Sequence, residues 1–252
     1  MVEDRPLCCM DDKASGNERL FVLSELETPG RAAGPAQSEA AWLEDIRPNN
    51  GLAYRLAKRA IDLVVTTIGL ILLSPVFLIV AVAIKAEDPK GKVLYVAPRG
   101  GLYNRPFPCM KFRSMYADAD DIKGQLMVRN EMSGPVFKIK DDPRVTRVGR
   151  FIRRTSIDEL PQLINVWLGQ MSLVGPRPLP VKEANAVTEI GKVRELVKPG
   201  ITCIWQTSGR NNIDFEEWMR MDAQYVKKQS LLFDLQLLIK TVPAVLSNDG
   251  AS

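Results

Sequence analysis

Hydrophobic and polar positions divide the chain into three parts. Residues 1–50 are polar and show no sustained hydrophobic period, so we expect a largely disordered extension there. Residues 63–84 run for 22 positions without a charged side chain, which predicts a hydrophobic helix within a membrane anchor at 51–86. Residues 87–252 mix apolar and polar positions as a folded domain does, and we expect this part to form one cytosolic domain.

The hydrophobic segment is long enough to cross a bilayer but is interrupted at its middle. A straight helix of 22 residues extends about 33 Å, against a hydrocarbon core of about 30 Å. Pro75, directly after Ser74, removes a backbone donor and predicts a kink. Basic residues flank both ends and favour the cytoplasmic side: Arg55, Lys58, Arg59, Lys85, Lys90 and Lys92. We expect a re-entrant helix that enters and leaves by one face, with a spanning helix or a buried core helix as alternatives.

The pattern of the remaining chain predicts an α+β fold that is predominantly helical. Strands at 92–97 and 107–115, joined by a turn-rich segment, form a small antiparallel β element, and 136–140 could add a third strand. Helical spacing predicts the other elements: 117–132, 145–154, 160–168, 182–197, 215–228 and 231–246. There is no βαβ alternation and no G-x-G-x-x-G or P-loop motif, so a Rossmann-type fold is not supported.

Composition narrows the chemistry that the chain can perform. It has 252 residues and no histidine, which excludes an imidazole base, a Ser-His or Cys-His nucleophile pair, and a His-ligated metal. Its four cysteines form no C-x-x-C pair, so we expect free thiols in a reducing compartment. A signal peptide has an apolar run behind a basic N-terminus. Residues 1–50 have no such run, so we expect no signal peptide.

The net charge of +4 conceals an uneven distribution. Residues 1–50 carry five basic and ten acidic side chains, whereas the rest of the chain carries 29 basic and 20 acidic ones. A basic body with an acidic extension indicates anionic partners for the body, such as phosphates, nucleic acid or a lipid surface.

A cluster of arginines precedes two adjacent acids. On a helix, the first four of these arginines recur every third position on one side: Arg144, Arg147, Arg150, Arg153, with Arg154 following. This face could be solvated, could contact anionic lipid headgroups, or could bind phosphate through bidentate guanidinium geometry.

Asp158 and Glu159 come next, at a predicted helix start. Ser156 and Glu159 have the spacing of a capping box, but Asp158 as the N-cap places Pro161 in the first turn and is preferred. Capping alone accounts for one acid. The second acid, beside arginines, would allow one carboxylate to attack a phosphorus atom while its neighbour holds Mg²⁺.

Weaker signals occur further along the chain. Pro176 and Pro178 stiffen a turn that presents Arg177, although an ordinary loop can have this composition. Arg210 lies in another basic turn. Asp234 interrupts an apolar run, and we interpret it as the solvated edge of a helix.

Together these residues resemble the bacterial sugar transferase family, the monotopic polyprenyl-phosphate phosphoglycosyl transferases that begin exopolysaccharide, capsule and O-antigen assembly. The resemblance extends from about Ala57 to Leu246. Its motifs occur in order: KRAID (58–62), SP (74–75), KFRSM (111–115), DPRVT (142–146), RRTSIDELPQL (153–163), MSLVGPRP (171–178), KPGIT (198–202) and WQTSGR (205–210). Cys203 departs from the pattern, because the family usually has glycine there.

The resemblance implies that Asp158 attacks the β-phosphate of a UDP-sugar and releases UMP, and that undecaprenyl phosphate then attacks the aspartyl phosphosugar. It implies Glu159, with Asp158 beside it, as the Mg²⁺ ligand, and Lys111 and Arg153 as further catalytic residues. The substrate-binding residues, with Arg177 on the nucleotide-sugar side, would be Arg113, Pro176, Arg177, Pro178, Arg210 and Asp234. The membrane element would be a re-entrant helix broken at Ser74 and Pro75.

The expected partners are therefore a UDP-sugar, a polyprenyl phosphate and the lipid bilayer, on the cytoplasmic face of a bacterial inner membrane. Nucleic acid is not expected as a partner, and homo-oligomerisation is left open. No residue selects between galactose and glucose as the transferred sugar. The rival from another class is a non-catalytic membrane-surface protein whose arginines bind lipid headgroups.

Overall fold

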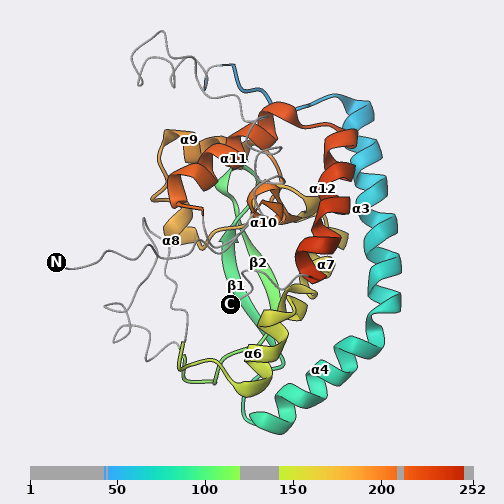
Figure 1. Ribbon diagram of the computed structural model, residues 1–252, viewed down its shortest axis with the longest axis vertical. Coiled ribbons are helices and arrows are strands. Elements are labelled where there is room, and N and C mark those ends of the chain that lie inside the picture. The colour runs from blue at the N-terminus through green and yellow to red at the C-terminus, as the bar shows by residue number, and fades with distance from the viewer. Residues whose placement is uncertain (1–42, 44, 120–141, 209–212, 247–252) are drawn as a thin grey trace, which may run out of the picture.

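The structure is a computed structural model that describes residues 43, 45–119, 142–208 and 213–246. Most of the expected extension, the predicted strand at 136–140 and nearly all of the predicted helix at 117–132 lie outside these ranges. A central β-hairpin lies between two long helices on one side and a group of shorter helices on the other (Figure 1).

The long hydrophobic element is a bent pair of helices. Helix α3 (Leu52–Leu72) and helix α4 (Ser74–Glu87) meet at Leu73 with a bend of 58°. The bend lies where the sequence predicts a kink, because Pro75 has no backbone N–H and sits in the first turn of α4. The Ser74 hydroxyl donates to the carbonyl of Ile71 at 2.8 Å. The helical element is longer than the predicted 63–84, because it also includes a polar first part.

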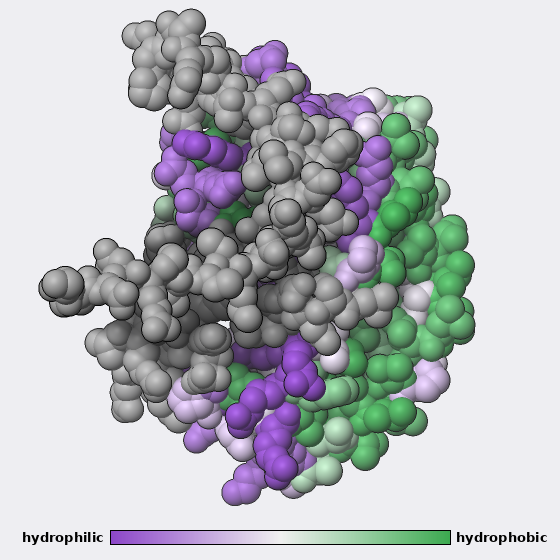
Figure 2. Space-filling model, in the orientation of Figure 1, coloured by the Kyte–Doolittle hydropathy of each residue, from purple (hydrophilic) through white to green (hydrophobic). Residues whose placement is uncertain are grey.

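The two faces of α3 are reversed relative to a helix of a soluble protein. Tyr54, Lys58, Asp62 and Thr66 recur every fourth position and face the domain. Asp62 accepts hydrogen bonds from the Ser172 hydroxyl at 3.1 Å and from the Leu173 amide at 3.0 Å. Large apolar side chains lie on the opposite, exposed face: Leu52, Leu56, Ile61, Val64, Val65, Ile68, Ile71 and Leu72. Figure 2 shows this hydrophobic surface gathered along the edge formed by α3 and α4.

The predicted antiparallel element is confirmed as a hairpin. Strand β1 (Leu94–Gly100) pairs with β2 (Pro106–Phe112) across the short 3-10 turn η1 (Leu102–Asn104). In this register Tyr95 lies opposite Lys111, and Arg99 lies opposite Phe107.

A second, parallel pair of strands was not predicted. Strands β3 (Ser172–Val174) and β4 (Gly200–Thr202) are three residues long and almost fully buried, so they show no alternation of polar and apolar positions. The helix predicted at 182–197 is wrong. The chain between the strands instead forms three short pieces: α8 (Val181–Ala184), α9 (Glu189–Lys192) and the 3-10 helix η4 (Val193–Leu196), and a further short helix, α10 (Ile204–Thr207), follows β4.

The last two helices agree with the prediction at both ends. Helix α11 (Phe215–Lys228) begins at Asp214, whose carboxylate accepts from the Glu217 amide at 2.8 Å as an N-cap. It supplies much of the hydrophobic core through Trp218, Met219, Met221, Ala223, Tyr225 and Val226. Helix α12 (Leu231–Leu246) packs beside α3 (Figure 1).

Candidate active site

The two adjacent acids lie in a tight turn between α6 (Arg147–Arg154) and α7 (Gln162–Trp167). Ser156 adopts a left-handed conformation with φ of 56°, and the chain then forms the 3-10 turn η3 (Ile157–Glu159). Both predicted helix starts are wrong. Ser156 forms no side-chain capping bond, Asp158 lies inside η3, and α7 begins only after Pro161. The carboxylates therefore project from a turn fixed by backbone bonds rather than capping a helix.

Glu159 is held by two cations. Lys111 Nζ lies 2.6 Å from Glu159 Oε1, and Arg177 donates to both carboxylate oxygens, with 2.8 Å between Nη1 and Oε2. Burial alone would raise the pKa of Glu159, but the charges and hydrogen bonds of Arg177 and Lys111 outweigh it and hold the pKa well below its usual range. The pairing with Lys111 and Arg177 therefore favours the ionised form of Glu159 and fixes its position.

Asp158 has a different environment from its neighbour. Its side chain is buried, yet it accepts no hydrogen bond from any described residue. Burial and the negative charge of Glu159 raise the pKa of Asp158 to about 6, against the opposing effect of Lys111 and Arg153. The structure thus places a carboxylate that accepts no hydrogen bond from the described residues beside one that is paired with two cations. This arrangement suits attack by Asp158 on an electrophile such as phosphorus.

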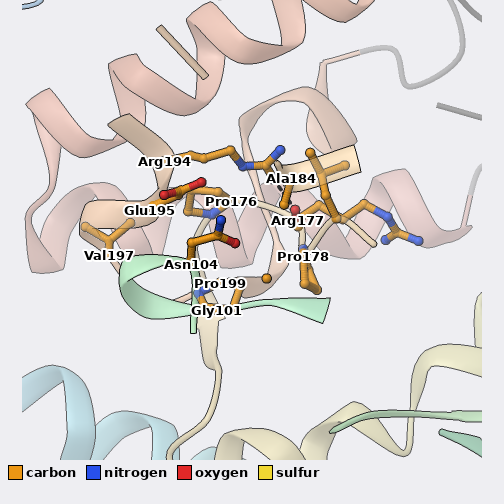
Figure 3. Close-up of a pocket in the computed structure, with 12 residues that line it drawn as sticks. Gly101, Asn104, Pro176, Arg177, Pro178, Ala184, Arg194, Glu195, Val197 and Pro199 are labelled. Carbon is orange, nitrogen blue, oxygen red and sulfur yellow. Dashed lines mark hydrogen bonds between the residues drawn. The ribbon is translucent and has the colours of Figure 1, made fainter. Parts of the chain in front are cut away.

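Arg177 comes from a rigid turn that follows β3. Pro176 and Pro178 are buried, and the Gly175 amide donates to the carbonyl of Thr202 on β4 at 3.0 Å. A Cβ at Gly175 would lie 2.4 Å from the carbonyl oxygen of Lys198, so the close approach requires glycine. Figure 3 shows the backbone of this turn lining a pocket, while the Arg177 guanidinium extends away from it.

Arg194 of η4 supports the same turn from behind. It donates to the Arg177 carbonyl, pairs with the buried Asp222 of α11 at 3.3 Å, and lies 5.5 Å from the centre of the Trp218 ring. Sequence reasoning missed Arg194 and Asp222. The sequence did contain a signal for this pair. Asp222 falls among the apolar positions of α11, and a charged side chain on a buried helix face needs a partner of opposite charge.

Other predicted residues lie apart from the acidic pair. Arg113 donates to the Asp88 carbonyl at 2.9 Å and pairs with the Asp88 carboxylate at 3.4 Å, at the end of α4. Arg210 lies outside the described residues. The predicted one-sided arginine face is wrong, because α6 begins at Arg147 and Arg144 instead pairs with Asp142 at 2.6 Å. Arg153, in contrast, lies near the pair: it donates to the Ser114 hydroxyl at 2.8 Å, and its positive charge acts on Asp158.

Asp234 is a buried link between helices and not a solvated edge, so that interpretation is wrong. Its carboxylate accepts from Tyr54 at 2.9 Å, Lys58 at 2.7 Å and Tyr225 at 2.7 Å. The prediction failed because it considered α12 alone, whereas the polar stripe of α3 covers this position. Cys203 raises no difficulty as a replacement for glycine, because its φ of −153° is ordinary extended backbone.

Comparison with known proteins identifies relatives of the chain. Residues 53–248 match the family model described as bacterial sugar transferase. The chain is 44% identical to the galactosyl transferase CpsE of Streptococcus agalactiae and 40% identical to the undecaprenyl-phosphate galactose phosphotransferase of Salmonella typhimurium, covering 79% and 82% of this chain.

The chain spans 44% of the length of each of these two relatives. It is also 38% identical to the exopolysaccharide production protein ExoY of Sinorhizobium fredii, over 82% of this chain and 91% of that protein. A family match over most of the chain, together with relatives at this level of identity, shows that the chain belongs to the bacterial sugar transferase family.

Proposed function

We propose that the protein transfers a sugar-1-phosphate from a UDP-sugar to undecaprenyl phosphate and so begins the assembly of an exopolysaccharide. The names of the relatives support the reaction class. The observation that carries the proposal is the buried Asp158, which accepts no hydrogen bond from the described part of the chain, beside the paired Glu159, with three cations around them.

In the first step, an Asp158 carboxylate oxygen attacks the β-phosphorus of the UDP-sugar. The bond from this phosphorus to the bridging oxygen breaks, and UMP leaves with that oxygen and the bonding electrons. Arg177 and Lys111 hold Glu159 in place and contribute positive charge beside the diphosphate. The positive charge of Arg153 lowers the pKa of Asp158 and so favours the ionised carboxylate.

In the second step, a phosphate oxygen of undecaprenyl phosphate attacks the same phosphorus. The acyl phosphate bond breaks and returns the carboxylate of Asp158, and the product is undecaprenyl diphosphate sugar. Of the protein itself, these two displacements at one phosphorus require a single nucleophilic side chain and no histidine.

The two acids also fit Mg²⁺. One or two carboxylates, with substrate phosphates and water, are the usual ligands of this ion, and Asp158 has free oxygens to offer. No group of three His, Cys, Asp or Glu that could hold a metal occurs among the described residues, so the substrate would complete the shell. Asp158 and Glu159 would hold the ion, which would neutralise charge on the diphosphate.

The proposed location is a membrane surface, with the bent pair α3–α4 inserted from one side. Among the described residues no single helix is long and apolar enough to cross a bilayer, whereas this pair meets the criteria of length and composition when taken together. Its exposed face carries many large apolar side chains, with Leu72 71% exposed and Leu52 69% exposed, and a contiguous apolar surface of this kind marks a membrane or protein contact.

Purified protein incubated with Mg²⁺, undecaprenyl phosphate and either UDP-galactose or UDP-glucose tests the reaction. We expect release of UMP and not UDP, and a covalent phosphosugar adduct when the lipid is omitted. Asp158→Asn should release no UMP and form no adduct, whereas Glu216→Gln, an exposed carboxylate replaced in the same way, should behave as wild type. Full activity in Asp158→Asn would overturn the mechanism.

A further inference from the structure

Arg99 of β1 is a partly buried arginine. Its guanidinium forms no hydrogen bond or ion pair with any residue in the described part of the chain. Removal from water lowers the pKa of Arg99, and the attraction of Glu183 and other nearby groups only partly compensates. Lys111 and Arg177, by contrast, are both engaged with Glu159.

The register of the hairpin places Arg99 on the face that carries the active site. Residues directly opposite in an antiparallel pair share a face, as do alternate residues along each strand. Tyr95 pairs with Lys111 and Arg99 with Phe107, so Lys111 and Arg99 project from the same side. They lie four residues apart in register, about 13 Å along the strands at 3.3 Å per residue.

The charged groups near Cys109 agree with that placement of Arg99. Cys109 lies between the two positions on β2, and the charges acting on its thiol come from Lys111, Arg99, Glu159 and Arg177. The positive charge of Arg99 also acts directly on Arg177. Arg99 is thus a cation on the face of the hairpin that carries Lys111, within the field of Arg177, and Glu159 does not neutralise it.

Arg99 lies at the end of the hairpin that is remote from α4. Its backbone forms a bridge with Pro180, just after the Arg177 turn, whereas Phe112 at the other end packs with Val80 and Ile84 of α4. A water-soluble nucleotide could approach the Arg99 end without passing the apolar helix pair, while a lipid phosphate would arrive along that pair.

We propose that Arg99 binds a phosphate oxyanion of the nucleotide-sugar donor, next to Arg177. The assignment rests on the proposed function, because it names a further residue of the same site. A guanidinium offers two parallel N–H donors to a phosphate, and a desolvated cation without a partner gains most from such a ligand. The described residues compensate the charge of Arg99 only in part, and a phosphate of the donor would give its guanidinium a directly bonded anion.

Nucleotide binding by full-length protein in detergent tests the assignment without requiring turnover. Titration calorimetry with UMP, UDP-glucose and UDP-galactose should give a Kd about tenfold or more higher for Arg99→Gln than for wild type. Arg99→Lys should recover part of the loss. Arg105→Gln is the matched control, because Arg105 is an exposed arginine at the turn of the same hairpin, and its Kd should stay within twofold of wild type.

Two further measurements sharpen the test. The unfolding midpoint shows whether Arg99 has a structural role, and the KM values show whether Arg99 acts on the UDP-sugar or on undecaprenyl phosphate. Loss of an unpaired buried charge should leave the unfolding midpoint of Arg99→Gln equal to or above that of wild type. In turnover assays the KM for UDP-sugar should rise and the KM for undecaprenyl phosphate should not. An unchanged nucleotide Kd, or a rise confined to the lipid KM, would overturn the assignment.

The outcomes also distinguish this assignment from the proposed function. Wild-type protein that binds nucleotide but releases no UMP would contradict the transferase mechanism, and the Kd comparison would still decide the role of Arg99. Wild-type protein that binds none of the three nucleotides would overturn both.

Discussion

Glu159 and Asp158 are adjacent in sequence but differ in how their charge is compensated. Glu159 faces Lys111 and Arg177, whereas Asp158 is buried without a hydrogen bond from any described residue. The difference arises from the 3-10 turn, which points successive side chains in different directions. Compensation on one acid leaves the other free to react.

Glu159→Gln tests this division of roles. The substitution removes the anion between two part-buried cations, so we expect a loss of about 3 kcal/mol in the free energy of unfolding and a fall in UMP release of about 100-fold or more. Urea denaturation and a UMP-release assay measure the two effects. Glu189→Gln, which removes an exposed acid paired with Lys192, should change both little. Full UMP release by Glu159→Gln would show that the paired carboxylate is not needed for the transfer.

Asp222 should make stability depend on pH in a predictable direction. Burial raises the pKa of Asp222 to about 7, against the opposing attraction of Arg194. The thiol of Cys203 also lies in its field. Because the folded state then binds a proton more tightly than the unfolded state, the contribution of Asp222 to stability falls as pH rises from about 4 to about 7.

Asp222→Asn removes that titration. The difference in unfolding free energy between Asp222→Asn and wild type should therefore shift in favour of the variant between pH 5 and pH 8, as measured by urea denaturation. Glu216→Gln on the same helix is exposed and should show no such shift. Equal differences at both pH values would show that Asp222 does not titrate in this range.

At the scale of elements, sequence patterns predicted those pieces whose own periodicity is strong. Helices α11 and α12 have long helical stripes, the hairpin has alternating strands, and Pro75 marks the bend. Strands β3 and β4 escaped prediction because they are short and buried, and they pair across a long connection. Within the site, the acids were identified from their motif, but Arg99, Arg194 and Asp222 required knowledge of which elements face one another.

The ion pair between Lys58 of α3 and Asp234 of α12 is a second case in which tertiary contacts, and not the pattern of one helix, decide the environment of a residue. Asp234→Asn leaves the Lys58 ammonium buried without its counterion, and we expect a loss of about 3–5 kcal/mol in unfolding free energy. Adding Lys58→Met should restore part of this loss, because the double variant contains no unpaired charge. Urea denaturation of the single and double variants gives the coupling energy, and strictly additive effects would contradict the link.

At the scale of the whole molecule, both ends of the bent pair are attached to the same domain. The Asn49 amide donates to the Gln229 side chain at 3.1 Å, between α11 and α12. At the other end, the Glu87 carboxylate accepts from the Arg147 and Val148 amides of α6 at 2.7 Å and 2.8 Å. A single folded domain cannot lie on both sides of a bilayer, so these contacts support the proposed insertion of the helix pair from one face.

Cysteine labelling tests that topology directly. Asn50→Cys and Lys90→Cys are exposed positions just outside the two ends of the pair, whereas Leu73→Cys lies at its bend. In a background without Cys8 and Cys9, an impermeant maleimide should label both end positions from the cytoplasmic side and should not reach Leu73→Cys from either side. The remaining Cys109 and Cys203 are buried and serve as the unlabelled baseline. Labelling of the two ends from opposite sides would mean that the pair spans the bilayer, and the contacts of Asn49 and Glu87 could not then coexist in the membrane.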